Sequence, residues 1–403
     1  MKSIRNIDIK KIISNYRLFL ILFVLIAIVS SIQPLTSGTS VHDKIGLSYN
    51  HYNNYSIFKY SFQHLVDYED LYIMHIDDHF DLYKYTPTFS VFFGIFAVFP
   101  DWIGLNLWNI FNALILLGSI YYLPKFNNYQ KGLILIIILI ELLTSIQNTQ
   151  SNAVIAALFV YAFGFMERKK YLLATLFITF SVFIKLFGII GFALFILYPN
   201  KLKLALYSLL WTIILFLIPL LFIDIEQYRL LISSYIDMLK SDHTDSHGFS
   251  VMGWLYTWFS LEFNKYAVVI VGAILFLLPM IKISNYKYYT FRILTLASIL
   301  IWVVIFNHKA ESPTFILAMT GVAIWFIIGE KTPLNNVLFW SAFILTSLSP
   351  TDLFPSIVRE EIVIPFVLKG VPCILIWGKL IYDMLWMKSE SLAIESSDSI
   401  KEH

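Results

Sequence analysis

Long apolar runs, separated by short polar connections, make up most of the chain. A helix that crosses the hydrocarbon core of a bilayer needs about 20 predominantly apolar residues. Several runs are shorter, and short helices are stable at membrane depth where they pack against protein or line a water-filled cavity. The pattern predicts an all-α polytopic membrane protein with about twelve transmembrane helices. The runs cover residues 18–33, 88–100, 102–123, 132–147, 153–166, 171–184, 186–198, 204–223, 266–281, 293–306, 314–328, 337–349 and 363–386.

Composition excludes the main alternatives to a membrane protein. The chain has 403 residues, of which 58% are hydrophobic and 14% charged, against about 25% charged residues in soluble domains. A soluble globule or a disordered chain needs far more polar surface. The 29 basic and 27 acidic residues give a net charge of +2, which is too balanced for a nucleic-acid-binding protein. The lone cysteine, Cys373, lies in an apolar run, where we expect a buried, inert thiol.

Two stretches are polar enough to lie outside the bilayer, and we expect both to be external loops: residues 34–87 and 224–265. The second half of 224–265 has the pattern of a surface helix. We expect residues 1–387 to form a single transmembrane domain and residues 388–403 a polar cytoplasmic tail. The basic N-terminus leads into the first apolar run without an A-x-A cleavage motif, which favours a retained helix over a signal peptide.

Lysine and arginine positions predict the orientation in the membrane. If region 88–123 crosses once, the basic connections fall on one side, which the positive-inside rule assigns to the cytoplasm; two crossings would reverse the bias downstream. We favour one crossing with both termini cytoplasmic, in the plasma membrane of a bacterium. The unusual polar segments then meet at the external face, which predicts a reaction site there. The basic connections are 124–131, 167–170, 199–203, 282–292 and 329–336.

The densest group of ionisable residues lies near the end of the first external loop. Asp77, Asp78 and Asp81 flank His79, and Lys84 and Tyr85, which we expect to bind the phosphate or sugar of a donor, follow shortly after. All six of these residues lie within the nine positions 77–85. Carboxylates beside an imidazole suit general-base catalysis or the binding of a hard metal ion. The alternative is a solvated acidic loop.

Three polar residues further along favour an anion or sugar site. Gln150 and Asn152 lie at the start of an apolar run, where the free N–H groups of a helix N-terminus attract anions. The alternative is a helix cap in which Ser151 or Asn152 bonds these amides. Lys185 interrupts an apolar run, and an isolated cation there is costly in lipid, so we expect it to bind a phosphate rather than to reach the interface.

The segment IFNHKAESPTF combines an imidazole, an ammonium and a carboxylate at a helix start, with Ser312 as a candidate cap. We expect His308 and Glu311 to contact the donor; the alternative is a polar turn. Glu141 is a further intramembrane charge, for which we expect a cationic partner that the sequence does not name. A zinc site is a weaker alternative in the second loop, where His243, Asp245 and His247 alternate.

The order of these motifs resembles a known family. The features are a long first loop with YEDLY, then YKYTPTF leading into an apolar run, QSN before a helix, IK within TFSVFIKLF, and the late polar turn HKAESPTF. Across residues 50–330 the chain resembles the GT-C superfamily of glycosyltransferases, and most closely glycosyltransferase family 87, the alpha-mannosyltransferase-like group. The resemblance implies a GT-C-like helical bundle with two long external loops.

The resemblance also implies a reaction. Such enzymes move a sugar, here a mannose-like hexose, from a polyprenyl-phosphate donor to a glycan or glycolipid acceptor, by a single displacement that inverts the anomeric carbon. A carboxylate of the first external loop serves as base. The donor lipid and the membrane lipids are thus the expected partners, with no nucleic acid. No cofactor motif is present in the sequence; we expect no cofactor, and a divalent metal ion stays open.

One position departs from the family pattern. Where the family usually has an early aspartate, this sequence has Asn54, and an amide cannot act as a base. Asp81, then Asp78, then Asp77 are the candidates to replace it, in order of their distance from the Tyr-Thr-Pro segment. Two other functions compete with the enzyme: a transporter or flippase of lipid-linked sugars, and a non-catalytic partner in envelope assembly. Transporters of this kind tend to have repeats and paired broken helices, which the sequence lacks.

Overall fold

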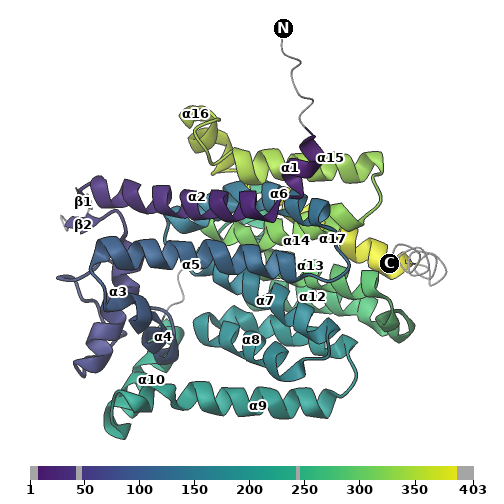
Figure 1. Ribbon diagram of the computed structural model, residues 1–403. Helices are drawn as coiled ribbons and strands as arrows, with labels where there is room; N and C mark the ends of the chain where they lie inside the picture. The colour runs from purple at the N-terminus through teal and green to yellow at the C-terminus, as the bar shows by residue number, and fades with distance from the viewer. Residues whose placement is uncertain (1–7, 42–47, 242–245, 388–403) are drawn as a thin grey trace.

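A computed structural model describes residues 8–41, 48–241 and 246–387 of the protein. These residues fold almost entirely into helices (Figure 1). The α-helices are α1 (Ile9–Ile13), α2 (Tyr16–Thr36), α3 (Asn53–Val66), α4 (Pro87–Ala97), α5 (Asp101–Tyr122), α6 (Asn128–Gln147), α7 (Asn152–Glu167), α8 (Tyr171–Ile184), α9 (Lys201–Leu217), α10 (Ile225–Ser241), α11 (Val251–Phe259), α12 (Lys265–Leu277), α13 (Tyr289–Ile305), α14 (Phe315–Ile328), α15 (Pro333–Ala342), α16 (Ser356–Val358) and α17 (Val371–Trp386). Short 3₁₀ segments are η1 (Leu186–Leu197), η2 (Ile218–Leu221), η3 (Leu278–Ile281), η4 (Ile283–Lys287) and η5 (Ser312–Thr314), and π-helical turns are η6 (Phe343–Leu348) and η7 (Arg359–Val363).

The long helices form a bundle, and the helices at its centre have no polar face. α7 packs against α5 and α8, and α13 packs against α14. Nearly every residue of α7 and α14 is buried, as expected for helices without a polar face. By contrast, α9 leaves most of its apolar side chains exposed, as suits a helix that faces lipid. α3, α4, α10 and a two-stranded antiparallel hairpin of β1 (Thr39–Val41) and β2 (Ser48–Asn50) gather at one end of the bundle, on the left of Figure 1.

Four helices in the described part of the chain are long and apolar enough to cross a membrane. They are Tyr16–Thr36, Asp101–Tyr122, Asn128–Gln147 and Lys201–Leu221. The expected count of about twelve is not confirmed, because several apolar runs break into shorter pieces. The run 88–100 forms α4, which has 11 residues and at 1.5 Å per residue is only about 16 Å long. The run 363–386 becomes α-helical only at Val371.

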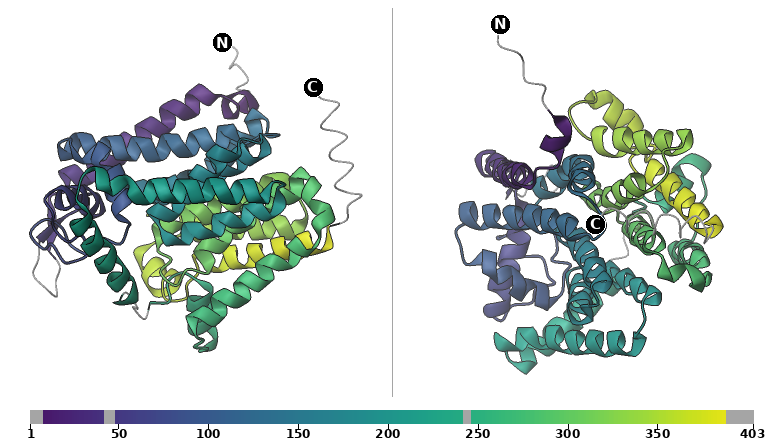
Figure 2. Two further views of the ribbon diagram at one scale, coloured as in Figure 1. Left: turned by 90° about the horizontal axis from the view of Figure 1, so that it is seen from below. Right: turned by 45° about the vertical axis from the view of Figure 1, so that its right-hand side comes forward.

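The two ends of the helical bundle, which Figure 2 shows in two views, are held by different polar contacts. At one end Arg292 forms a two-pronged ion pair with Glu167, at 2.6 and 2.7 Å, and the Tyr289 hydroxyl donates to the Pro124 carbonyl at 2.6 Å. Three of the predicted cytoplasmic connections therefore lie together. At the other end the amide of Gln147 contacts that of Gln33 at 3.2 Å. The 16 residues of α7 separate the two ends by about 24 Å.

The cationic partner expected for Glu141 is Lys369, in a buried ion pair. Lys369 Nζ lies 2.8 Å from Glu141 Oε1, and the two side chains are 2% and 0% exposed. Lys369 also lies over the Phe315 ring, 5.2 Å from its centroid. The carboxylate on α6 is therefore compensated by a cation that follows η7, more than 200 positions later in the chain.

Both predicted external loops are more structured than their polarity indicates. Residues 34–87 contain the hairpin and α3, whose inner face is buried. Residues 224–265 contain α10 and α11, and α11 occupies the segment for which a surface helix was expected. The thiol of Cys373 is buried, as predicted. The predicted tail, 388–403, lies outside the described residues.

Candidate active site

A break between α8 and η1 positions the Lys185 side chain. The backbone turns from helical to extended at Lys185 (φ −140°, ψ 132°). Gly188 allows the chain to fold back closely, because a Cβ there would lie 2.5 Å from the Ser181 carbonyl carbon. The Thr86 hydroxyl donates to the Phe183 carbonyl in the last turn of α8. This hydrogen bond holds the Tyr-Thr-Pro segment against the end of α8.

The Lys185 ammonium contacts residues from two other parts of the sequence. Its Nζ donates to Asn152 Oδ1 at 3.0 Å and to Gln150 Oε1 at 3.3 Å, and lies 5.4 Å from the centroid of the Tyr85 ring. We call Tyr85, Gln150, Ser151, Asn152 and Lys185 the Lys185 cluster. Within the described ranges no carboxylate oxygen lies within 4.0 Å of this ammonium. A half-buried cation thus meets only neutral oxygens, whereas Lys59, Lys84 and Lys369 each face a carboxylate.

The start of α7 in this cluster has no side-chain cap. Ser151 is the N-cap residue, but its φ and ψ of −88° and 3° do not aim its hydroxyl at the amides of the first turn. The hydroxyl instead lies 3.5 Å from the Tyr85 hydroxyl, and Asn152 points to Lys185. The alternative, a helix cap by Ser151 or Asn152, was therefore wrong. The ammonium contacts the side chain of the first residue of α7, and a cation and a helix N-terminus both favour an anion.

Asp81 and Lys84 lie beside this cluster. Lys84 Nζ is 3.3 Å from Asp81 Oδ1, and Asp81 has a left-handed backbone, with φ of 85°. Lys84 lines a cavity of about 440 Å³ together with Lys309 and Glu311. Lys84 directly precedes Tyr85 of the Lys185 cluster in the sequence, although none of the cluster residues lines this cavity.

The late polar turn reaches the same cavity. Residues 307–311 join α13 to η5, and the Ala310 carbonyl accepts the Phe249 amide at 2.9 Å. Glu311 is exposed into the cavity, and His308 is half-buried in the same turn. Ser312 is not the helix cap that was expected; Glu311 precedes η5, and no side chain caps it.

The two other candidate carboxylates lie elsewhere. Asp77 and Asp78 line a second cavity of about 310 Å³, with Asn53 and His79. Burial, with the neighbouring imidazole of His64, lowers the pKa of His79 to about 4. The three loop aspartates therefore do not form one group.

Asn54 lies in the first turn of α3, and its side-chain amide donates to the Asn148 carbonyl at 2.9 Å. This bond ties α3 to the turn that leads into the Lys185 cluster. Asn53, which the sequence did not single out, bonds the backbone of Phe80, accepting from its amide at 2.8 Å. Asn53 is the first residue of α3, and no sequence motif marked it. In the second loop His243 and Asp245 lie outside the described residues, and the His247 ring packs on Tyr256, with centroids 4.7 Å apart.

An apolar groove of about 570 Å³ runs along the helices that carry the cluster. Hydrophobic side chains of α4, α5, α7, α8 and α9 line almost all of it. They include Phe92, Ile115, Leu158, Phe180 and Leu215, with Thr88 at the start of α4. No sequence motif marked this groove, because its residues are ordinary apolar residues from five separate helices.

Comparison with known proteins identifies the family. A sequence model of glycosyltransferase family 87 matches residues 83–348, which is more than half of the chain. The match includes Lys84, Tyr85, the Lys185 cluster and the late polar turn, and it begins after the loop aspartates. No curated protein matches the chain. An apolar helical bundle with a family 87 match over this length is a membrane glycosyltransferase, and the chain belongs to glycosyltransferase family 87.

Proposed function

We propose that this membrane glycosyltransferase moves a mannose-like hexose from a polyprenyl-phosphate donor to the hydroxyl of a glycan or glycolipid at the external face of a bacterial plasma membrane. The observation that carries the proposal is the environment of Lys185. Its ammonium has only neutral oxygen partners among the described side chains and lies at the uncapped start of α7. A phosphate would neutralise the cation and accept from the free amides.

The apolar groove supports a lipid-linked donor over a soluble one. Two helices, α7 and α8, contribute to both the groove and the cluster. Along α7, Leu158 follows Asn152 by six residues, and along α8, Phe180 precedes Lys185 by five. These spacings correspond to about 9 and 7.5 Å of helix. An isoprenoid chain in the groove would therefore end with its phosphate next to the ammonium.

The reaction is a single displacement. The acceptor oxygen bonds to the anomeric carbon as the bond from that carbon to the phosphate oxygen breaks, and the configuration inverts. The acceptor proton passes to a carboxylate base, and polyprenyl phosphate leaves as an anion stabilised by Lys185 and the α7 amides. The leaving group is already a weak base, so it needs stabilising charge rather than a strong acid.

Asp81 is the base that we propose. It contacts Lys84, which lines the 440 Å³ cavity, and its left-handed backbone is the kind of local strain that clusters at functional sites. Asp77 and Asp78 line a different cavity. We propose that Glu311 and His308 contact the sugar, with Gln150 and Asn152 orienting the ammonium.

A transfer assay tests the function against its two rivals. The purified protein is reconstituted in vesicles with radiolabelled polyprenyl-phosphate mannose and a pool of glycan and glycolipid acceptors. A labelled acceptor is expected. Movement of the donor between leaflets without product would indicate a transporter, and neither outcome would indicate an assembly partner.

The base assignment has its own variant. Asp81→Asn should lower kcat by about 10²- to 10⁴-fold, the usual contribution of a positioned base, while donor binding is kept. Asp237→Asn is the matched control, because that exposed aspartate also pairs with a lysine three residues away. Full activity in Asp81→Asn removes this residue as the base.

A further inference from the structure

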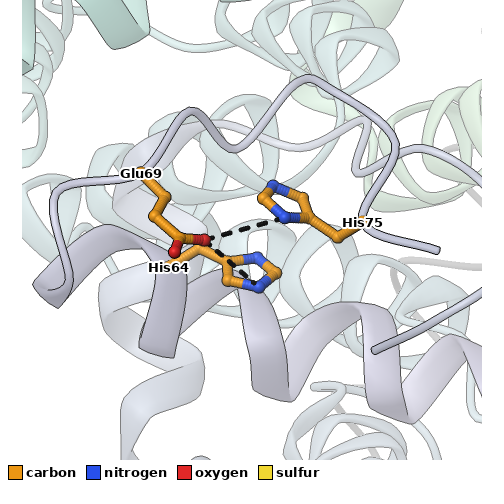
Figure 3. A group of neighbouring side chains, drawn as sticks. All are labelled: His64, Glu69 and His75. Atoms are coloured by element: carbon orange, nitrogen blue, oxygen red, sulfur yellow. Dashed lines mark ion pairs between the residues drawn. The ribbon is translucent and has the colours of Figure 1, made fainter. Parts of the chain in front are cut away.

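A second group of ionisable side chains lies in the first external loop, outside the Lys185 cluster and its cavity. Figure 3 shows His64, Glu69 and His75 pointing toward one another. His64 belongs to the last turns of α3, and the other two belong to the loop that follows. Glu69 Oε2 lies 3.7 Å from His64 Nε2 and 3.7 Å from His75 Nδ1. Asp78 Oδ2 lies 2.9 Å from the same His64 nitrogen.

We propose that His64, Glu69 and His75 bind a divalent transition-metal ion, with Zn²⁺ as the best fit, and that Asp78 becomes the fourth ligand when the ion replaces its hydrogen bond to His64 Nε2. Two imidazole nitrogens and two carboxylate oxygens are a donor set that zinc accepts in tetrahedral sites. Zinc-to-ligand distances of about 2.0–2.2 Å place neighbouring tetrahedral ligand atoms about 3.4 Å apart. The contacts of 2.9 and 3.7 Å given above are within about half an ångström of that value, and the ligand atoms of His64, Glu69 and His75 all lie within 4.8 Å of one another.

The His75 ring already has the tautomer that a metal needs. Its Nε2–H donates to the Asp70 carbonyl at 2.8 Å, which leaves the lone pair on Nδ1, the atom that faces Glu69. Such a backbone bond to the second ring nitrogen orients metal-bound histidines. Asp70 is itself held, because its carboxylate accepts from the Ser234 hydroxyl of α10 at 2.7 Å.

The ligands also come from parts of the chain that an ion would hold together. The Glu69 carbonyl accepts from the Gln227 side chain of α10 at 2.9 Å. The segment between α3 and α4 has no regular secondary structure, so few backbone bonds define its course. The ion would fasten this segment, which leads to Asp81 and Lys84, onto α3.

Two local adjustments are required: the hydrogen bond between His64 Nε2 and Asp78 Oδ2 must give way to the ion, and the His75 ring must move. The rings of His64 and His75 now stack, with centroids 3.6 Å apart and an angle of 21° between planes. A shared ion must lie near both ring planes, so the His75 ring has to tilt away from His64. His75 is on the irregular segment, which makes this tilt a local adjustment.

Metal analysis of the full-length protein tests the site. The purified chain, without an affinity tag, is loaded with Zn²⁺ in detergent, desalted and measured by elemental mass spectrometry, with affinity from a competing chelator. We expect one ion per chain. Glu69→Gln and His75→Ala should each weaken Zn²⁺ binding at least tenfold, and Glu69→Gln keeps the shape of an exposed side chain, so it should fold. Co²⁺ should give the visible absorption of a four-coordinate site in the wild type only.

Two controls decide the location. His51→Ala removes an exposed imidazole of the same loop region, whose ring is hydrogen-bonded to Ser40, and this variant should bind Zn²⁺ as the wild type does. Absence of Zn²⁺ from the loaded wild type overturns the proposal. Zn²⁺ affinity that is unchanged in both Glu69→Gln and His75→Ala also overturns it. Loss of Zn²⁺ binding in His247→Ala, with binding kept in Glu69→Gln, would place the ion in the second loop instead and overturn it as well. Because the readout is metal content, the result is independent of the transfer assay.

Discussion

Replacing Lys185 by methionine removes the ammonium and keeps an unbranched apolar stem of similar length. The structure gives this cation two neutral hydrogen-bond acceptors, at 3.0 and 3.3 Å, and no carboxylate within 4.0 Å among the described residues. Its charge is therefore available to a bound phosphate. A hydrogen bond to a charged group contributes about 1.5–3 kcal/mol. At 1.4 kcal/mol for each factor of ten, donor affinity should fall by about 10- to 150-fold.

The same substitution also affects the folded protein. Asn152 is 1% exposed, and its Oδ1 would lose the donor that it has in the wild type. An unsatisfied buried acceptor costs about 1–3 kcal/mol, so Lys185→Met should unfold at a lower temperature. Lys185→Arg keeps the charge and a donor for Asn152, and it should retain more donor affinity than the methionine variant.

The assay is equilibrium binding of radiolabelled polyprenyl-phosphate hexose to the purified protein in detergent, together with a thermal unfolding curve for each variant. Lys240→Met is the control, because Lys240 is 71% exposed and pairs with Asp237 on α10, away from the cluster. Donor affinity in folded Lys185→Met that equals that of the wild type would refute the phosphate site, and with it the observation on which the proposed donor rests.

Two further predictions concern the bundle. Lys369→Met leaves Glu141 charged and buried without its partner, so it should destabilise the protein by about 3–5 kcal/mol; the double variant with Glu141→Gln should recover much of the loss in thermal unfolding, and no recovery would mean that the pair does not act as a unit. Leu176→Trp fills the apolar groove and should raise KM for a long-chain donor more than for a short-chain one. Leu173→Trp, at an exposed position of the same helix, should leave both values unchanged; an equal effect of Leu176→Trp on the two donors would contradict the use of the groove by the lipid.

The sequence by itself determined the class of the protein. Apolar runs and few charges leave no soluble fold open, because buried apolar surface must face either protein or lipid. It also located most of the residues of the Lys185 cluster. A lone lysine in an apolar run and polar residues at a helix start are costly or orphaned wherever the helices lie, so local chemistry alone singled out Lys185, Gln150 and Asn152.

Tertiary structure decided which residues meet. The partner of Glu141 is Lys369, from the last part of the chain, and no local pattern could name it because the pairing depends on how α6 packs. The three loop aspartates look equivalent in sequence, yet Asp81 contacts Lys84 while Asp78 contacts His64. The path of an irregular loop sets these contacts, and its course depends on α3 and α10, which lie far apart in the sequence. The helix ends likewise depend on packing, so apolar runs alone could not give the number of spans.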